Sequence, residues 1–192
     1  MPEVEASPFP SQTPSPTATI VWFPPTATPT PFLTPVIAPT QEYRPGIGDI
    51  ILEDDFSSKG AWTTGQSPSA SVAFGKNELT IAIAQPGGYG NSVRQEPILS
   101  DFYLEITASP TLCRGSDEYG VLFRVNSSAD FYRFSLSCDG RARLDKLLGG
   151  VASSPQPWME SGVIPVGAPS ISRLAAWVQG SEMRFFVNDF FL

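Results

Sequence analysis

The sequence contains no histidine, and this absence removes most catalytic and metal-binding arrangements. Histidine is the usual general base at neutral pH, a member of the Ser-His-Asp and Cys-His arrangements, and the commonest ligand of transition metals. With only two cysteines, a zinc site built from thiolates is excluded as well. We therefore expect no cofactor and no transition-metal centre.

Positive charge is also scarce, with 12 Lys and Arg against 19 Asp and Glu and a formal net charge of -7. Because nucleic-acid binding needs lysine and arginine to neutralise phosphates, nucleic acid is excluded as a partner. The longest apolar run near the start, residues 20–23, is too short to span a bilayer, and the first three residues lack the basic region of a signal peptide. We expect no membrane span in this chain and an anchor or further domain upstream of it.

Proline is unevenly distributed, since 12 of the 20 prolines fall in residues 1–45 together with eight threonines. Proline lacks an amide donor and is excluded from helix interiors, so this stretch is expected to be a disordered, extended linker. At about 3.1 Å per residue it reaches on the order of 140 Å when fully stretched. We interpret it as a stalk that carries a folded domain of residues 46–192, with a plain disordered tail as the alternative.

The remaining residues consist largely of short runs in which apolar and polar side chains alternate. Seven runs are rich in β-branched, aliphatic or aromatic residues: 79–84, 102–108, 119–125, 131–137, 142–148, 171–178 and 182–188. Most are bounded by Gly, Pro, Asn, Asp or Ser, and no window shows a helical period. This pattern predicts an all-β fold, an antiparallel β-sandwich or barrel.

The alternation also assigns a core face and an outer face to each strand. The residues expected on the core face are Leu79, Ile81, Ile83, Phe102, Leu104, Ile106, Val121, Phe123, Val125, Tyr132, Phe134 and Leu136. In the central meander, residues 119–148, the expected polar face consists of Arg124, Arg133, Ser135, Arg143 and Asp145.

The register of the meander follows from matching these faces across its turns. We predict Phe123 opposite Phe134 and Val125 opposite Tyr132. For the second turn, a three-residue bulged loop with Gly140 in the left-handed conformation places Leu136 opposite Leu144. The commoner two-residue Asp-Gly turn shifts the register by one residue and puts Leu144 on the polar face, so the bulged loop is preferred.

The two cysteines, Cys113 and Cys138, flank the first two strands of the meander. An antiparallel pair returns the chain to its starting point, so the two side chains are expected to lie close together and to form a disulfide. Two buried free thiols are the alternative. A disulfide is typical of exported proteins, and together with the stalk it predicts an extracellular or cell-surface location.

Several strand and turn motifs together resemble a known family. They are DDFS (54–57), Trp62, FGKNELTI (74–81), YGVLFR (119–124), FYRF (131–134), CDGR (138–141), PW (157–158), RL (173–174) and FFVN (185–188). Residues 49–192 are similar to the concanavalin A-like lectin/glucanase, or laminin-G-like, jelly rolls of secreted or membrane-anchored bacterial proteins. The resemblance implies two curved antiparallel sheets and, often, a sugar-binding role.

The chain departs from this family at residues 187–192, where similar domains turn and add closing strands. We therefore expect an open sheet edge with exposed apolar side chains, which is an aggregation hazard. Two alternatives stay open at this point: the chain is a truncated product or fragment, or a partner chain or oligomer fills the edge.

The glucanase branch of the family places three carboxylates at alternating positions of one strand, in the pattern E-x-D-x-x-E. That pattern is absent, Glu105 stands alone on its strand, and Asp54 and Asp55 are adjacent and so point to opposite sides. We expect a non-enzyme, with a glycoside hydrolase-related enzyme as the weakest alternative. A structural calcium site near Asp54, Asp55 and Asn188 is kept as an undecided alternative.

Sugar binding requires a flat aromatic ring for the pyranose face and polar groups for its hydroxyls. The candidate ligand-binding residues on polar faces are Tyr103, Glu105, Arg124, Arg133, Arg143, Asp145 and Trp177. Arg124 and Arg133 are expected to face each other, and this like-charge pair favours an acidic polysaccharide as ligand. Trp62 and Trp158 are expected in loops, packed over an end of the sandwich.

The sequence thus predicts a non-catalytic, extracellular carbohydrate-binding or adhesion module displayed on a stalk. The runner-up is a structural protein-interaction domain that is completed by a strand from a partner chain.

Overall fold

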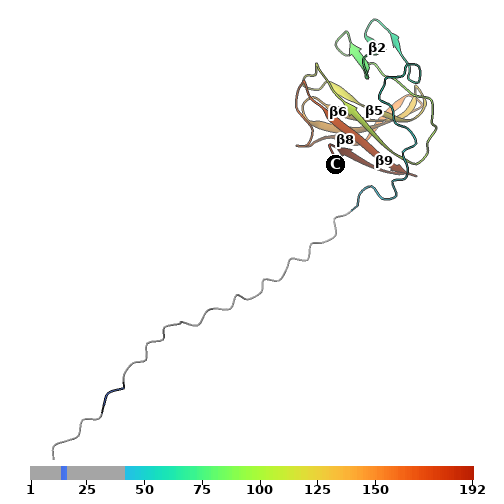
Figure 1. The fold of residues 1–192 in the computed structure, drawn as a ribbon. Coiled ribbons are helices and arrows are strands. Elements are labelled where there is room, and N and C mark those ends of the chain that lie inside the picture. Colours follow the sequence, from blue (N-terminus) through green and yellow to red (C-terminus); the bar gives the residue numbers. More distant parts are fainter. Residues whose placement is uncertain (1–13, 17–41) are drawn as a thin grey trace, which may run out of the picture. The chain divides into compact units, whose positions relative to one another are not determined.

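A computed structural model describes residues 14–16 and 42–192 of the chain. The chain divides into two units, Met1–Thr40 and Gln41–Leu192, and the account below concerns the second. The predicted stalk lies outside the described residues apart from residues 14–16 and its last four residues, 42–45. Figure 1 shows the second unit as a set of packed β-sheets.

The described residues form eleven β-strands and no helix, which confirms the predicted all-β class. The strands are β1 (Gly65–Gln66), β2 (Ala70–Phe74), β3 (Leu79–Ile83), β4 (Phe102–Ala108), β5 (Glu118–Ser127), β6 (Asp130–Ser137), β7 (Arg141–Leu148), β8 (Val151–Glu160), β9 (Ser172–Gln179), β10 (Glu182–Val187) and β11 (Phe190–Phe191). They make three antiparallel sheets, in the orders β1-β2-β3, β11-β10-β9-β4 and β5-β6-β7-β8. Among these residues, nothing has the length and hydropathy of a membrane-spanning helix.

The two four-stranded sheets pack face to face, and the main core lies between them. One sheet contributes Phe134 and Leu136, and the other contributes Leu174 and Val178, all fully or almost fully buried. The ring of Phe185 crosses the space, with its centroid 4.7 Å from that of Phe134. The predicted antiparallel β-sandwich is therefore confirmed, and it rests on apolar burial from both inner faces.

Each of the seven predicted strands is present, with ends that differ by at most two residues. The sequence pattern missed β1, β2, β8 and β11, and the longest of these is β8, in which Pro155 and Pro157 break the alternation of apolar and polar residues. Proline cannot donate to a strand ladder, and it is tolerated here because β8 is the edge strand of its sheet.

The predicted register of the meander is wrong by two residues. Phe123 lies opposite Tyr132, and Leu136 lies opposite Ala142. A three-residue turn with a left-handed glycine is present as expected, and Gly140 has a φ of 87°. It spans residues 138–140, however, one position earlier than predicted. A shift of two residues leaves every side chain on its assigned face, so the face assignment survives the error.

A β-bulge at Arg124 changes the end of β5. The pairing with β6 shifts between Phe123 and Ser127, and Arg124 has a positive φ of 49°. Val125 is consequently 37% exposed, so its predicted place in the core is wrong. The expected pair of Arg124 and Arg133 is also wrong, because Leu122 takes the position opposite Arg133.

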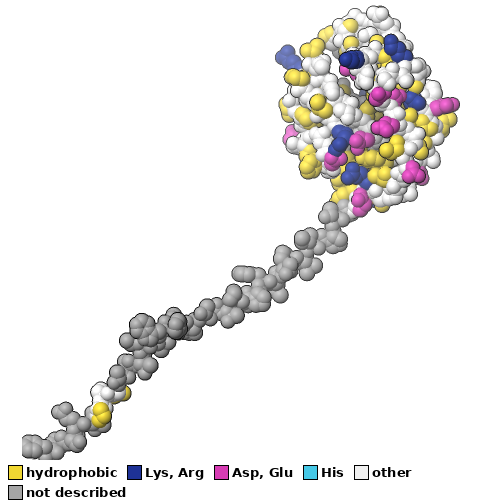
Figure 2. All heavy atoms as spheres, in the orientation of Figure 1, with side chains coloured by type: hydrophobic (Ala, Val, Ile, Leu, Met, Phe, Trp, Pro, Cys, Tyr) yellow, Lys and Arg dark blue, Asp and Glu magenta, His cyan; other side chains and the backbone are white. Residues whose placement is uncertain are grey.

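The small sheet of β1, β2 and β3 pairs with neither four-stranded sheet. Ile81 and Ile83 on β3 are 44% and 49% exposed, and neither belongs to the main core. The prediction that they face the core is therefore wrong, because this strand pairs only within its own sheet. In Figure 2, hydrophobic side chains are visible on the surface of this unit.

Cys113 and Cys138 form a disulfide, as predicted, with their Cα atoms 5.7 Å apart. Cys138 follows β6 and is 2% exposed. The bond ties the loop before β5 to the turn after β6, next to Gly140.

Candidate functional site

The sequence-predicted ligand residues fall on two different outer faces of the sandwich. Arg133, Arg143 and Asp145 lie on β6 and β7, and Tyr103, Glu105 and Trp177 lie on β4 and β9. Arg124 belongs to neither group, since its guanidinium donates to the carbonyls of Ser100 and Gly180 at 2.9 and 2.7 Å. The predicted set therefore does not form a single site.

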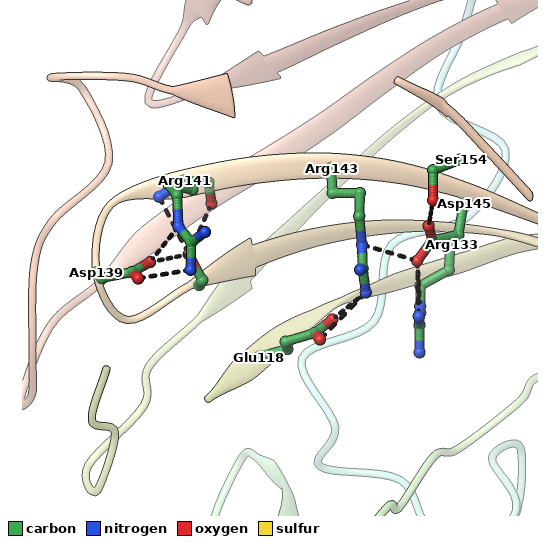
Figure 3. A network of polar contacts seen from close by, with 8 residues as sticks. Glu118, Arg133, Asp139, Arg141, Arg143, Asp145 and Ser154 are labelled. Carbon is green, nitrogen blue, oxygen red and sulfur yellow. Dashed lines mark hydrogen bonds and ion pairs between the residues drawn. The ribbon is translucent and has the colours of Figure 1, made fainter. Parts of the chain in front are cut away.

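On the first face, Asp145 is the centre of a polar network (Figure 3). It lies directly across from Arg133 in the β6–β7 ladder and is 3% exposed. Its Oδ2 accepts hydrogen bonds from Arg133 Nη2 at 2.6 Å and Nε at 3.2 Å. Its Oδ1 accepts one from Ser154 of β8 at 2.6 Å, and Arg143 Nε lies 3.0 Å from Oδ2 as an ion pair.

Arg143 extends this network to an aromatic ring. Its Nη2 donates to both carboxylate oxygens of Glu118, at 3.1 and 3.0 Å. Its guanidinium carbon lies 4.4 Å from the centroid of the Trp158 ring, and that of Arg141 lies 5.2 Å from the same centroid. Cations over an indole ring are attracted by its negative face. We call Glu118, Arg133, Arg143, Asp145, Ser154 and Trp158 the polar platform.

The platform carries balanced charge, with two arginines and two carboxylates. Burial raises the pKa of Asp145, but the hydrogen bonds from Ser154 and Arg133 and the two nearby guanidinium charges outweigh it. The pKa therefore lies below its ordinary value, and the carboxylate is ionised at neutral pH. The reason for expecting an acidic ligand, an unpaired Arg124–Arg133 contact, is absent from the fold. Over the face that Figure 2 displays, acidic and basic side chains are interspersed.

Stability is expected to fall as the pH drops below about 4. The pKa of Asp145 is lower in the folded chain than its ordinary value of 3.8, so its contribution is present above that value. It is lost as the pH falls through the folded-state value. Asp130, held by the Gly149 amide, and Asp139, held by Arg141, shift in the same direction.

Urea unfolding at a series of pH values measures this dependence. The Asp145→Asn variant cannot titrate at that position, so its stability is expected to fall less steeply between about pH 5 and pH 2. Identical slopes for the two proteins contradict the assignment.

On the second face, Tyr103 and Trp177 contact the segment of residues 43–45, whereas Glu105 is exposed. Trp177 is 5% exposed, and its indole Nε1 donates to the carbonyl of Pro45 at 3.0 Å. The hydroxyl of Tyr103 donates to Glu105 at 3.0 Å and accepts from Arg44 at 3.4 Å. Burial raises the pKa of this hydroxyl. A sugar reaches Trp177 only if this segment is displaced.

The acidic residues considered for calcium make other contacts. Asp54 accepts hydrogen bonds from Trp62 Nε1 and Arg94 Nη1, both at 2.9 Å. The hydrogen bond from Trp62 is the largest cause of a lowered pKa at Asp54. The side chain of Asn188 bonds the amide of Arg173 and the carbonyl of Val163, each at 3.0 Å. Within residues 14–16 and 42–192, no three Cys, Asp or Glu residues are grouped to hold one metal ion.

Two open cavities lie elsewhere on the described unit. One of about 240 Å³ is lined by residues of β1 and β2 together with Tyr89 and Asn91 from the chain after β3. The other, of about 410 Å³, lies between Pro110 and Ile171. Neither is lined by a platform residue, and within the platform Asp145 is buried, Trp158 is half-buried and Ser154 is exposed.

Three platform residues were not among the predicted ligand residues. Glu118 ends up near Arg143 because β5 begins beside the end of β6. Trp158 was expected in a loop, and this is wrong, since it lies on β8. The sequence signal that could have placed Trp158 on an edge strand was Pro157 directly before it, because edge strands tolerate proline.

No protein-family model matches this sequence, and no significant match is found among curated proteins or among solved structures. The jelly-roll connection order and the concanavalin A-like family thus stay predictions from the strand and turn motifs.

Proposed function

We propose that residues 46–192 form a non-catalytic, extracellular carbohydrate-binding module, and that it binds a neutral polysaccharide on the polar platform. The observation that carries this proposal is Trp158, a half-buried residue of the edge strand β8 with the guanidinium groups of Arg141 and Arg143 over its ring. An aromatic ring with fixed polar groups around it is the combination that sugar recognition requires.

The ion pairs support this role because they hold the polar groups in place before a ligand arrives. Arg133 and Arg143 share the carboxylate of Asp145, which is itself held by Ser154. A guanidinium has five N–H donors, more than these contacts use, so donors remain for sugar hydroxyls. Preorganised groups lose less conformational entropy on binding.

The charge of the platform favours a neutral ligand over an acidic one. The two guanidinium groups are neutralised by Asp145 and Glu118. The whole chain carries a formal charge of -7, which repels an anionic polymer at low salt. The Cys113–Cys138 disulfide is consistent with an oxidising compartment and so with the proposed extracellular location.

Replacing Trp158 by alanine is expected to weaken polysaccharide binding by up to about tenfold, since aromatic contacts of this kind contribute about 0.5–1.5 kcal/mol. The full chain is tested by affinity electrophoresis on a panel of neutral polysaccharides, namely β-glucan, xylan and mannan, with pectate as the acidic member. Trp62→Ala is the matched control, because Trp62 is also half-buried but bonds Asp54 outside the platform.

If Trp158→Ala and Trp62→Ala weaken polysaccharide binding equally, the platform is not the binding face. A wild-type chain that is retarded by no member of the panel, or by pectate alone, overturns the proposed ligand.

A second candidate function is completion of a sheet by a strand from a partner chain. In the described sheets, β4 and β5 are terminal strands, and the apolar Ile81 and Ile83 are exposed on β3. Unpaired edge strands and exposed apolar surface are the features through which strands are added.

This second candidate predicts assembly that grows with protein concentration and is unaffected by sugar. Sedimentation velocity over a wide concentration range measures it. Ile81→Lys with Ile83→Lys is expected to abolish the assembly, and a chain that stays monomeric at every concentration rules out self-assembly at this surface.

A further inference from the structure

The outer face of the sheet β11-β10-β9-β4 carries an aromatic surface. Cross-strand pairing aligns Tyr103, Trp177 and Arg184 in one row, because Trp177 pairs with both of the others. The neighbouring row contains Phe186 of β10 and Phe191 of β11, which also pair. We call these five residues the aromatic face.

Residues 43–45 lie on this face and are held by their main-chain carbonyls. Trp177 Nε1 donates to the carbonyl of Pro45 at 3.0 Å, and Arg184 Nη1 donates to the carbonyl of Tyr43 at 3.0 Å. The guanidinium of Arg184 in turn lies 4.7 Å from the Trp177 ring and pairs with Glu182 at 2.7 Å. Both donors are thus fixed by the sheet itself.

The side chains of the segment fill the rest of the face. The ring of Tyr43 stacks on Phe191 with 4.2 Å between centroids and 6° between planes. Arg44 lies over Phe186 at 5.1 Å and reaches the Tyr103 hydroxyl at 3.4 Å. Under this cover, Trp177 and Phe186 are 5% and 3% exposed.

We propose that the aromatic face is a peptide-binding site for segments of the pattern aromatic-x-proline, and that residues 43–45 are its occupant in the same chain. A proline-rich segment has few amide donors of its own, so its carbonyls are free to accept hydrogen bonds. Indole donors among aromatic rings are a common means of binding such segments. The site is separate from the polar platform and does not depend on it.

The chain contains the same pattern twice more, in overlapping matches at residues 22–24 and 23–25. These residues lie outside the described part of the chain. A peptide of residues 21–26, VWFPPT, therefore provides an independent ligand of the same chemistry.

Hydrogen exchange of the Trp177 indole N–H in the ¹⁵N-labelled full chain tests the site. The chain has four tryptophans, and the Trp177 signal is assigned by its loss in Trp177→Phe. Tyr43→Ala is expected to speed exchange at this N–H by about tenfold or more, because the stacking on Phe191 and the carbonyl contact are weakened. Tyr89→Ala is the matched control, since Tyr89 is 51% exposed and outside the aromatic face.

Peptides added to the Tyr43→Ala chain then test binding directly. The peptide of residues 41–46, QEYRPG, and the peptide VWFPPT are both expected to restore slow exchange, whereas QEARPG is not. The proposal is overturned if Trp177 exchanges rapidly in the wild type, if Tyr43→Ala behaves like Tyr89→Ala, or if neither peptide restores protection. Restoration by QEYRPG alone overturns the aromatic-x-proline pattern.

Discussion

Replacing Asp145 by alanine is expected to lower the free energy of unfolding by about 3 kcal/mol and to abolish polysaccharide binding. The carboxylate is 3% exposed and lies between Arg133 and Arg143, whose side chains are 27% and 20% exposed. Without it, two partly buried positive charges are left close together on neighbouring strands. The figure is at the low end for a broken buried pair because water still reaches both guanidinium groups.

Asp139→Ala is the matched control for this substitution. Asp139 also pairs with an arginine, Arg141 at 2.6 Å, but it is exposed and lies in a turn. Its loss is expected to lower the free energy of unfolding far less than the loss of Asp145, because solvent screens an exposed ion pair. Urea unfolding of both variants measures the difference, and the polysaccharide panel measures binding. If Asp145→Ala is no less stable than Asp139→Ala, the network is open to solvent and does not organise the platform.

Replacing both Cys113 and Cys138 by serine is expected to lower the free energy of unfolding by about 3–3.5 kcal/mol. The disulfide closes a loop with a sequence separation of 25, and its main effect in the chain-entropy model is to restrict the unfolded chain. The bond also ties the loop before β5 to the turn of residues 138–140. Its loss therefore frees the end of the β6–β7 hairpin on which Asp139 and Arg141 lie.

Urea unfolding of the double variant, beside the wild type with and without reductant, measures this effect. The reduced wild type is expected to unfold at the same urea concentration as the double variant. An unchanged midpoint in both shows that the cysteines are not bonded in solution, and it removes one support for the extracellular location.

Residues 43–45 cover one of the two outer faces of the sandwich but not the other. This difference decides which of the aromatic candidates a sugar can reach. Judged from the sequence, Trp177 and Tyr103 are aromatic residues suited to sugar binding. In the structure, however, both contact residues 43–45. Trp158 lies on the other sheet and is not covered by that segment. Trp158, which the sequence pattern placed in a loop, is thus the aromatic residue best placed to contact a sugar.

The errors in the sequence interpretation share one cause. Alternation of apolar and polar residues shows on which face of a strand a side chain lies, but not which residue of which strand it pairs with. The register of Phe123 and Leu136 was off by two residues, and the alternation pattern is identical in both registers. The bulge at Arg124 was not foreseeable, because a positive φ at a non-glycine residue has no signal in the pattern. Ile81 and Ile83 alternate as core residues do, but their sheet pairs with neither of the larger ones.

The amino-acid order by itself determined the antiparallel β class, seven strands, the disulfide, and the inner and outer faces of the strands except at Val125 and on β3. These follow from contacts between residues close along the chain, namely period-two alternation, turn residues and a hairpin that returns to its start. Only the tertiary structure decided which polar side chains meet. Asp145 joins Arg133, Arg143 and Ser154 through cross-strand register, and residues 43–45 cover Trp177 across more than a hundred positions of sequence. These contacts depend on how the strands are ordered within the sheets, and long-range strand pairing leaves no local pattern in the sequence.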